Sequence, residues 1–366
     1  MTFLDDAATA ADELTALRRS LHADPEVGLD LPRTQRRILD AIADLGLEIT
    51  LGTSSTSVVA VLRGGRPGPV VLLRGDMDAL PVTEETGLDY ASTNGAMHAC
   101  GHDLHVTGLV GAARLLAARR DDLPGSVIFM FQPGEEGDGG AARMIAEGVL
   151  DAAGERPVAA YGVHVATGKF GVFETRAGTL MAGANELHVT VHGRGGHGSQ
   201  PATSVDPVPA LLEFGSALQT MVTRRFSVFD PVVVTVTQLS AGQAVNVIPP
   251  SARLGATVRA LSQASVDTLI VETKRLAEGI ASAHGCTVDV DFQIDYPVTV
   301  NDPDEAAFAL AVATDLVGPD DARELAAPHM GSEDFSYVLN EIPGAFVFLG
   351  ATPPEVDWET AAWNHS

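Results

Sequence analysis

The hydrophobic pattern of residues 184–296 differs from the pattern on either side of it, and this difference constrains the fold most. Apolar residues alternate with polar ones along several short stretches, which indicates strands, and recur with helical spacing between them. The resulting order is strand, helix, strand, strand, helix, strand. The predicted strands are 186–192, 232–239, 253–260 and 287–294, and the predicted helices are 206–223 and 266–284.

The surrounding sequence alternates helices with nearly continuous apolar strands, which implies an α/β layer whose sheet is covered on both faces. The predicted strands are 57–62, 70–74, 126–131, 159–165 and 345–349, and the predicted helices are 11–21, 34–45, 104–120, 139–148, 302–316 and 332–339.

The length of 366 residues fits two domains, or one large domain that carries an insertion. The order of elements in 184–296 is the split βαβ unit of ferredoxin-like domains. We therefore predict an α/β domain formed by residues 1–183 and 297–366, interrupted by a ferredoxin-like α+β domain at residues 184–296.

Composition limits the partners and the compartment. The 23 basic and 48 acidic residues give a net charge of −25, which argues against a nucleic acid or an anionic membrane as partner. No apolar run approaches the roughly 18 residues of a membrane span. Residues 1–19 are acidic and lack a basic apolar leader, so we expect no signal peptide. Two cysteines, Cys100 and Cys286, exclude a disulfide scaffold and predict a reducing, cytoplasmic location.

Residue types that bind metals stand at the ends of several predicted strands. Asp76 and Asp78 follow one strand, Glu135 and Glu136 follow another, and His164 lies at the end of a third. Sites in α/β sheets form at the carboxyl ends of strands. If these strands share a sheet, their side chains converge on one edge.

Cys100 and His102 precede a predicted helix and are two residues apart. In an extended loop, this spacing puts both side chains on one face, where they can chelate one ion or two adjacent ions. The alternative is a buried cysteine followed by a His102–Asp103 pair that caps the helix.

Glu135 and Glu136 are adjacent, so their side chains point apart. One carboxylate can then bind a metal while the other faces a water molecule as general base. The alternative is a solvated acidic loop. The preceding buried strand and the other residues at strand ends favour the metal interpretation.

His197 lies in the glycine-rich stretch 193–201. No Lys-Ser or Lys-Thr pair follows, which argues against a phosphate-binding loop. The stretch is either a flexible loop that presents one imidazole or an ordinary hairpin. Further along, Ser332 is placed to cap the predicted helix 332–339.

Together these segments resemble the M20 family of metallopeptidases, in the amidohydrolase branch that includes aminoacylases, hippurate hydrolases and auxin-conjugate hydrolases. The ordered set of motifs is specific, although each motif alone is weak. The matching stretches are RRSLHADPEVGLDLPRT (18–34), RGDMDALPV (74–82), MHACGHDLH (97–105), QPGEEG (132–137), GRGGHGSQP (193–201) and HMGSEDFSY (329–337).

The resemblance implies a mixed-sheet, metallo-exopeptidase-like catalytic domain with an inserted lid that also forms a homodimer. It implies two divalent ions per subunit, either zinc, manganese, cobalt or nickel. Their ligands would be Cys100, His102, Glu136, His164 and His365. Members usually continue beyond the last of these ligands, whereas this sequence ends at Ser366.

By the same resemblance, Glu135 is the general base and Asp78 orients a ligand. Many members have a histidine at the position of Asp76 and lack the Cys100 ligand. This chain follows the cysteine-containing branch, which favours an amidase acting on N-acyl amino acids over an aminopeptidase.

His197 would stabilise the oxyanion, from its own subunit or from the partner. Asn246 and Arg259 resemble residues that hold a substrate carboxylate, the alternative being ordinary lid residues. The implied reaction releases a carboxylic acid and an amino acid. A dipeptidase or carboxypeptidase with the same site is the nearest alternative, and a non-catalytic, metal-binding dimeric protein is a more remote one.

Overall fold

The computed structural model describes residues 3–361 and divides into two compact units. Unit 1 contains residues 3–180, 300–327 and 334–361, and unit 2 contains Met181–Thr299 and Pro328–Glu333. The short segment Pro328–Glu333 thus groups with unit 2, whereas the sequence assigned it to the surrounding domain.

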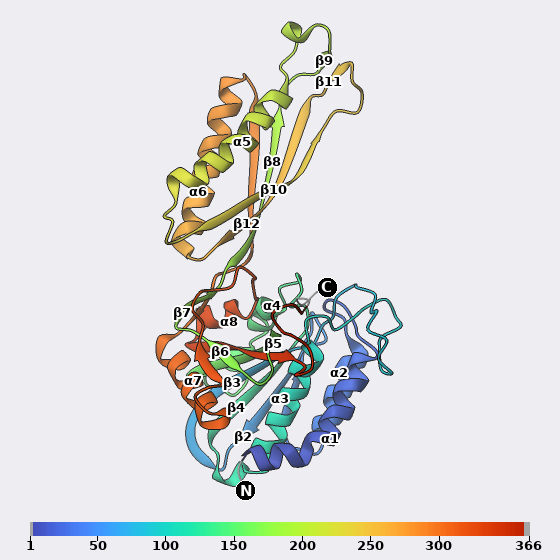
Figure 1. Cartoon of the computed structure of the whole chain (residues 1–366), viewed down its shortest axis with the longest axis vertical. Helices are drawn as coiled ribbons and strands as arrows, with labels where there is room; N and C mark the ends of the chain where they lie inside the picture. Colours follow the sequence, from blue (N-terminus) through green and yellow to red (C-terminus); the bar gives the residue numbers. More distant parts are fainter. Residues whose placement is uncertain (1–2, 362–366) are drawn as a thin grey trace. The chain divides into compact units, whose positions relative to one another are not determined.

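Unit 1 is built on an eight-stranded mixed sheet, in agreement with the predicted α/β class (Figure 1). The order is β1-β2-β4-β3-β5-β16-β6-β15. The central strands β4, β3, β5 and β16 run parallel to their neighbours in this series. The strands are β1 (Glu48–Leu51), β2 (Val58–Arg63), β3 (Arg66–Asp76), β4 (Pro124–Gln132), β5 (Ala159–Lys169), β6 (Phe173–Thr175), β15 (Ala322–Glu324) and β16 (Gly344–Thr352).

Three helices of unit 1, α1 to α3, lie side by side and cover β2 to β4 (Figure 1). Their apolar faces bury Ile38 and Val110 against Leu62 and Phe129, all with 0% exposure. This burial follows from the apolar strands that the sequence predicted. The α-helices of unit 1, including these three, are α1 (Phe3–His22), α2 (Pro32–Ile42), α3 (His102–Ala117), α4 (Gly140–Ala146), α7 (Pro303–Val317) and α8 (Ser336–Glu341).

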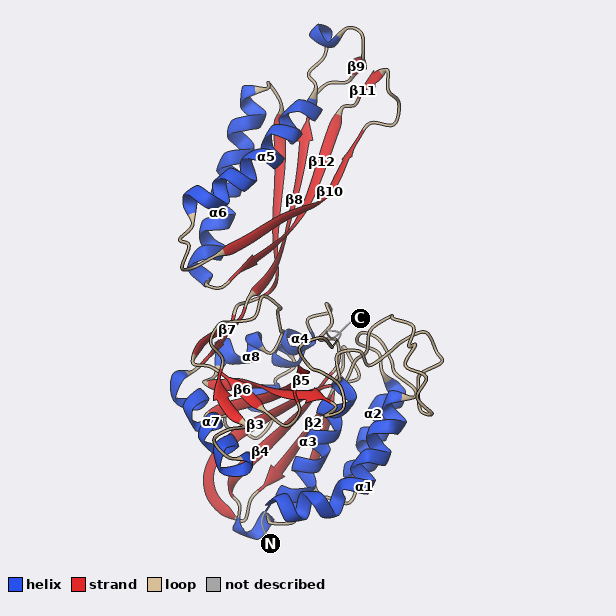
Figure 2. Ribbon diagram, in the orientation of Figure 1, coloured by secondary structure: helices blue, strands red, loops and turns tan. Residues whose placement is uncertain are grey.

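Unit 2 contains an antiparallel sheet of order β10-β12-β8-β13, with α5 and α6 side by side on one face (Figure 2). This order and the sequence of elements are those of a ferredoxin-like fold. The core lies between sheet and helices, where Leu187, Phe214 and Leu269 are buried. The elements are β8 (Gly183–His192), α5 (Pro207–Arg225), β10 (Val232–Ala241), β12 (Ser251–Ala260), α6 (Gln263–Ala283) and β13 (Thr287–Tyr296).

A small two-stranded sheet in unit 2 joins β9 (Gly196–His197) to β11 (Val247–Ile248). The sequence pattern did not predict either strand. Two further short strands, β7 (Gly178–Met181) and β14 (Thr299–Asn301), lie where the chain leaves and re-enters unit 1. Within residues 3–361, no helix combines the length and the apolar character needed to cross a bilayer.

The predicted cap at Ser332 is wrong. Helix α8 begins at Ser336, its N-cap residue is Phe335, and no side chain caps it. The hydroxyl of Ser332 instead accepts a hydrogen bond from Nη1 of Arg259 at 3.1 Å. Arg259 lies far from Ser332 in the sequence, so the local pattern could not reveal this hydrogen bond.

Candidate metal centre

The carboxyl ends of β3 and β4 meet at one edge of the sheet in unit 1, beside the middle of β5. β3 pairs in parallel with β4, where Asp76 lies opposite Gln132, and with β5 on its other side. The loops that follow β3 and β4 therefore emerge beside each other and carry Asp78 and Glu135. The sequence predicted this convergence from the ends of the strands, and it is confirmed for β3 and β4. For β5 the predicted end is wrong, because the strand continues to Lys169 and His164 lies within it.

Five side chains at this edge form two overlapping groups that could hold metal ions. Cys100, His102 and His164 offer ligand atoms that all lie within 4.8 Å of one another, and so do His102, Glu135 and Glu136. Sγ of Cys100 lies 3.4 Å from Nε2 of His164. Nε2 of His102 lies 3.8 Å from Oε1 of Glu136. We call these five residues the strand-end cluster; its two groups, joined at His102, suit two neighbouring ions.

The ring orientations of His102 and His164 direct Nε2 of both residues toward the other members of the cluster. Nδ1 of His102 donates to the backbone carbonyl of Asp78 at 2.9 Å, and Nδ1 of His164 donates to the carbonyl of Val165 at 2.6 Å. A carbonyl oxygen only accepts, so the proton of each neutral ring is on Nδ1. The lone pair is on Nε2, the atom by which His164 contacts Cys100 and His102 approaches Glu136.

The surroundings of His102 fit a cation. Its Nε2 is buried and has no hydrogen-bond partner in the described part of the chain. Burial lowers the pKa of His102, but the Asp76 carboxylate and the hydrogen bond to Asp78 outweigh burial and raise it well above its usual value. The site thus favours positive charge at a buried position, and the combination of thiol, imidazole and carboxylate suits a divalent transition metal.

Asp78 holds both the ring of His102 and the loop that carries Glu135 and Glu136. Its carboxylate is buried and accepts hydrogen bonds from the backbone N–H groups of Glu135 at 3.0 Å and Glu136 at 3.1 Å, while its carbonyl holds His102. One residue therefore sets the loop that carries both glutamates and the ring of a candidate ligand.

The structure also reveals a buried network that the sequence did not predict as a unit. Arg74 donates to Asp76 at 2.5 Å, and Asp76 bonds Nδ1 of His105 at 2.5 Å. Nε2 of His105 accepts from the backbone N–H of Val165 at 2.8 Å, beside His164. Both ring nitrogens of His105 are therefore used, which explains why this ring is not available as a ligand although it lies near His102.

Charge pairing stabilises this network. Burial would raise the pKa of Asp76, but the Arg74 guanidinium and the neighbouring imidazoles hold it well below its usual range. Burial lowers the pKa of His105 to about 4, so its ring is neutral near pH 7. The carboxylate of Asp334 accepts from Arg74 at 3.1 Å and from the amide of Gln132 at 2.7 Å. All five residues of this network stand in the quoted motifs, but only their contacts reveal what they do.

The capping alternative for His102 and Asp103 is wrong. The N-cap residue of α3 is Gly101, with φ of 83°, and no side chain caps the helix. Asp103 instead pairs with Arg18 and His22, at 2.8 Å in each case. It therefore joins the start of α3 to the end of α1.

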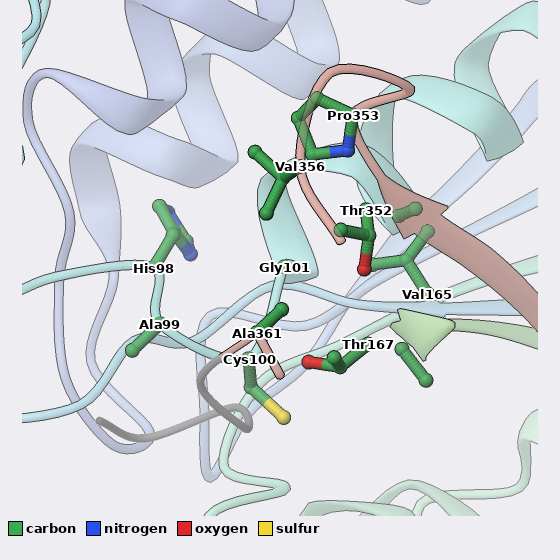
Figure 3. Close-up of a pocket in the computed structure, with 12 residues that line it drawn as sticks. His98, Ala99, Cys100, Gly101, Val165, Thr167, Thr352, Pro353, Val356 and Ala361 are labelled. Carbon is green, nitrogen blue, oxygen red and sulfur yellow. The ribbon is translucent and has the colours of Figure 1, made fainter. Parts of the chain in front are cut away.

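A cavity of about 280 Å³ opens beside Cys100 (Figure 3). The close-up shows the sulfur of Cys100 and the hydroxyl of Thr167 at the same border of the cavity, with Val165 and Thr352 nearby. His98, also at its border, is 5% exposed, and burial lowers its pKa to about 4. The cavity thus lies next to the strand-end cluster and is lined by both polar and apolar groups.

The remaining candidates lie elsewhere. His197, Asn246 and Arg259 belong to unit 2. β9 and β11 bring the backbones of the first two together, since the N–H of Gly198 donates to the carbonyl of Asn246 at 2.8 Å. Arg259 is half-buried beside Ser332. His365 falls outside the described residues.

Comparison with known families and proteins gives a consistent result. The model of peptidase family M20/M25/M40 matches residues 72–362. Thermostable carboxypeptidase 1 of Saccharolobus solfataricus is 36% identical over 355 residues, which cover 94% of this chain and 88% of that protein. IAA-amino acid hydrolase ILR1-like 2 of Arabidopsis thaliana is 38% identical over 345 residues, covering 93% of this chain and 77% of that protein.

Among solved structures, the YxeP protein of Bacillus subtilis is described as a dinuclear metal binding peptidase from the M20 family. It superimposes with a TM-score of 0.82 at 31% identity and covers 97% of this chain and 90% of its own. Two metal ions bound in a protein of the same fold agree with the two overlapping groups of the strand-end cluster.

Proposed function

Because this chain belongs to peptidase family M20/M25/M40, we propose that it hydrolyses the amide bond of N-acyl amino acids and releases a carboxylic acid and an amino acid. The family membership makes the protein a metal-dependent amidohydrolase. The observation that carries the proposal is the strand-end cluster, in which a cysteine takes part in one metal-binding group and adjacent glutamates in the other.

We assign the ligands of two divalent ions to Cys100, His102, Glu136 and His164, with His365 as the fifth. Soft thiolate and imidazole favour zinc, cobalt or nickel, while the carboxylate also admits manganese. When bound, such ions polarise a carbonyl group and lower the pKa of a water molecule. The chain contributes fixed Nε2 lone pairs on both histidines.

Glu135 is the proposed general base. Its carboxylate oxygen lies 4.0 Å from Nε2 of His102, and its backbone is held by Asp78. It would take a proton from the attacking water and pass that proton to the leaving amine. Glu136 has the adjacent position and the same anchor, so the two carboxylates can divide these tasks between base and ligand.

Unit 2 supplies the remaining proposed roles. His197 would donate a hydrogen bond to the substrate carbonyl oxygen as it becomes negative, and Asn246 and Arg259 would hold the substrate carboxylate. Unit 2 would serve as the lid and as the surface of a homodimer. Cys100 and Cys286 are not joined by a disulfide, which agrees with a cytoplasmic enzyme.

A carboxypeptidase is the second candidate, because the chain is 36% identical to thermostable carboxypeptidase 1. Both reactions release an amino acid that carries a free carboxylate. They differ in the group on the other side of the cleaved amide, which is an acyl group in one case and a peptide residue in the other. The substrate must therefore decide between them.

The test is release of amino acid from N-acetyl, N-benzoyl and indoleacetyl amino acids, and from dipeptides and N-blocked peptides. Each assay contains added zinc, manganese, cobalt or nickel, and elemental analysis gives the bound metal. We expect the highest kcat/KM with an N-acyl amino acid. Higher values throughout for peptides would favour the carboxypeptidase, and no release from any substrate would contradict both functions.

A further inference from the structure

In unit 2, backbone pairing between β9 and β11 supports the segment that carries His197. β9 and β11 pair so that His197 lies opposite Val247, and Gly198 donates to the carbonyl of Asn246. A Cβ atom on Gly198 would lie 3.2 Å from the backbone of Asn246, which is tighter than ordinary contact. Two chain segments therefore fix the backbone of this exposed histidine by their close approach.

Ser199 places two donors beside the ring. Its backbone N–H lies 3.2 Å from Nδ1 of His197, and its Oγ lies 2.9 Å from the same atom. A backbone N–H only donates, so Nδ1 must accept with its lone pair. The proton of the neutral ring is then on Nε2. A bond of 2.8 Å from the N–H of Gln200 to the carbonyl of His197 closes the turn and keeps Ser199 in place.

We propose that the hydroxyl of Ser199 is a positioning group that donates to Nδ1 of His197 and so holds the ring in the tautomer with its proton on Nε2. The inference rests on the proposed function, in which that N–H donates to the substrate carbonyl oxygen. The opposite tautomer would present a lone pair to the developing negative charge and repel it. Ser199 acts only through His197 and does not itself contact the substrate.

The first test compares Ser199→Ala and Ser199→Thr in the full chain. Loss of an oxyanion donor costs about 10²–10³ in kcat. Ser199→Ala removes only one support of the donor, so we expect kcat to fall on the order of tenfold while KM stays within about twofold. Ser199→Thr keeps the hydroxyl and should restore most of kcat.

The matched control is Ser204→Ala in the same loop. The hydroxyl of Ser204 donates to the carbonyl of Pro201 at 2.8 Å and does not bond the ring of His197. Its removal should leave kcat and KM unchanged. Equal losses in Ser204→Ala and Ser199→Ala would indicate a general loosening of the loop and would overturn the proposal.

The second test reads the ring directly by NMR of protein labelled with ¹⁵N-histidine, with the signals of residue 197 assigned through His197→Gln. The unmodified protein and Ser199→Thr should show the proton on Nε2, whereas Ser199→Ala should show a mixture of tautomers. An unchanged pattern in Ser199→Ala would overturn the proposal, and so would equal impairment of kcat in Ser199→Ala and Ser199→Thr.

Failure of the underlying function gives a different result. If His197→Gln keeps the original kcat, the role of His197 in the reaction is wrong. If no substrate is cleaved, the proposed function is wrong. In either case the ring spectra still decide whether the Ser199 hydroxyl holds the tautomer.

Discussion

The strand-end cluster of unit 1 and the loop around His197 in unit 2 are organised in opposite ways. His102 and Glu135 are buried, and Asp78 and its neighbours fix both by hydrogen bonds. His197 is exposed, and close glycine backbone and one serine hold it. A buried charge is destabilising unless it is paired, so substitutions in the cluster should affect both the free energy of unfolding and the reaction. The loop carries no such cost, and changes there should affect rate alone.

The largest expected effect is on turnover in Glu135→Gln, which removes the proposed base and keeps its shape. We expect kcat to fall about 10³-fold, in the middle of the range for general base catalysis. Bound metal, measured by elemental analysis, should not change. A variant that keeps most of its kcat would show that another group takes the proton.

His197→Ala should lower kcat by about 10²-fold through loss of one oxyanion donor. The midpoint of urea unfolding should stay where it is, because the side chain is exposed. A clear loss of stability in this variant would break the contrast between loop and cluster.

Asp334→Ala tests the expectation that buried, paired charges in unit 1 contribute to stability. It removes a buried carboxylate that bonds Arg74 and Gln132, so the free energy of unfolding should fall by about 3 kcal/mol. Urea denaturation followed by circular dichroism measures this. A loss below about 1 kcal/mol would mean that Asp76 alone satisfies the guanidinium.

Asp78→Asn should weaken metal binding by about 10-fold to 100-fold, since the new amide group meets a backbone N–H where an acceptor stood. Competition with a chelator gives the affinity. Unchanged affinity would show that the carbonyl of Asp78, which the variant keeps, suffices to orient His102.

The smallest effect concerns acid stability. Burial lowers the pKa of His98 to about 4, below its unfolded value, so the unfolded chain binds more protons between about pH 6.5 and pH 4. Stability falls as the pH falls through this window. Between pH 7 and pH 5.5 the loss from this residue should be about 1 kcal/mol. Urea unfolding of His98→Leu should show a correspondingly smaller loss, and an equal loss would assign the effect to other groups.

The sequence predicted the fold class because periodicity is local. The alternation in 186–192 and the apolar run in 126–131 both became strands of the expected kind. The small sheet of β9 and β11 was not predictable, since its two-residue strands form only through the pairing of His197 with Val247.

For the site, the ends of the strands indicated which residues to consider. They could not show that Asp76 is engaged by Arg74 and His105, because that depends on side chains meeting in a buried space. Nor could they show that Ser199 bonds His197, which needs the turn geometry. The sequence therefore showed which residue types could bind a metal or transfer a proton. It did not show how their partners orient them.

The position of β16 has a consequence for how the protein is made. This strand comes late in the chain, yet it lies between β5 and β6 in the middle of the sheet of unit 1. Most of unit 2 is a continuous stretch, Met181–Thr299, and all four strands of its main sheet leave the ribosome before β16. The inserted unit can therefore fold during synthesis before the sheet of unit 1 is complete. Until β16 has been synthesised, the edges of β5 and β6 that pair with it stay unpaired and are open to chaperones.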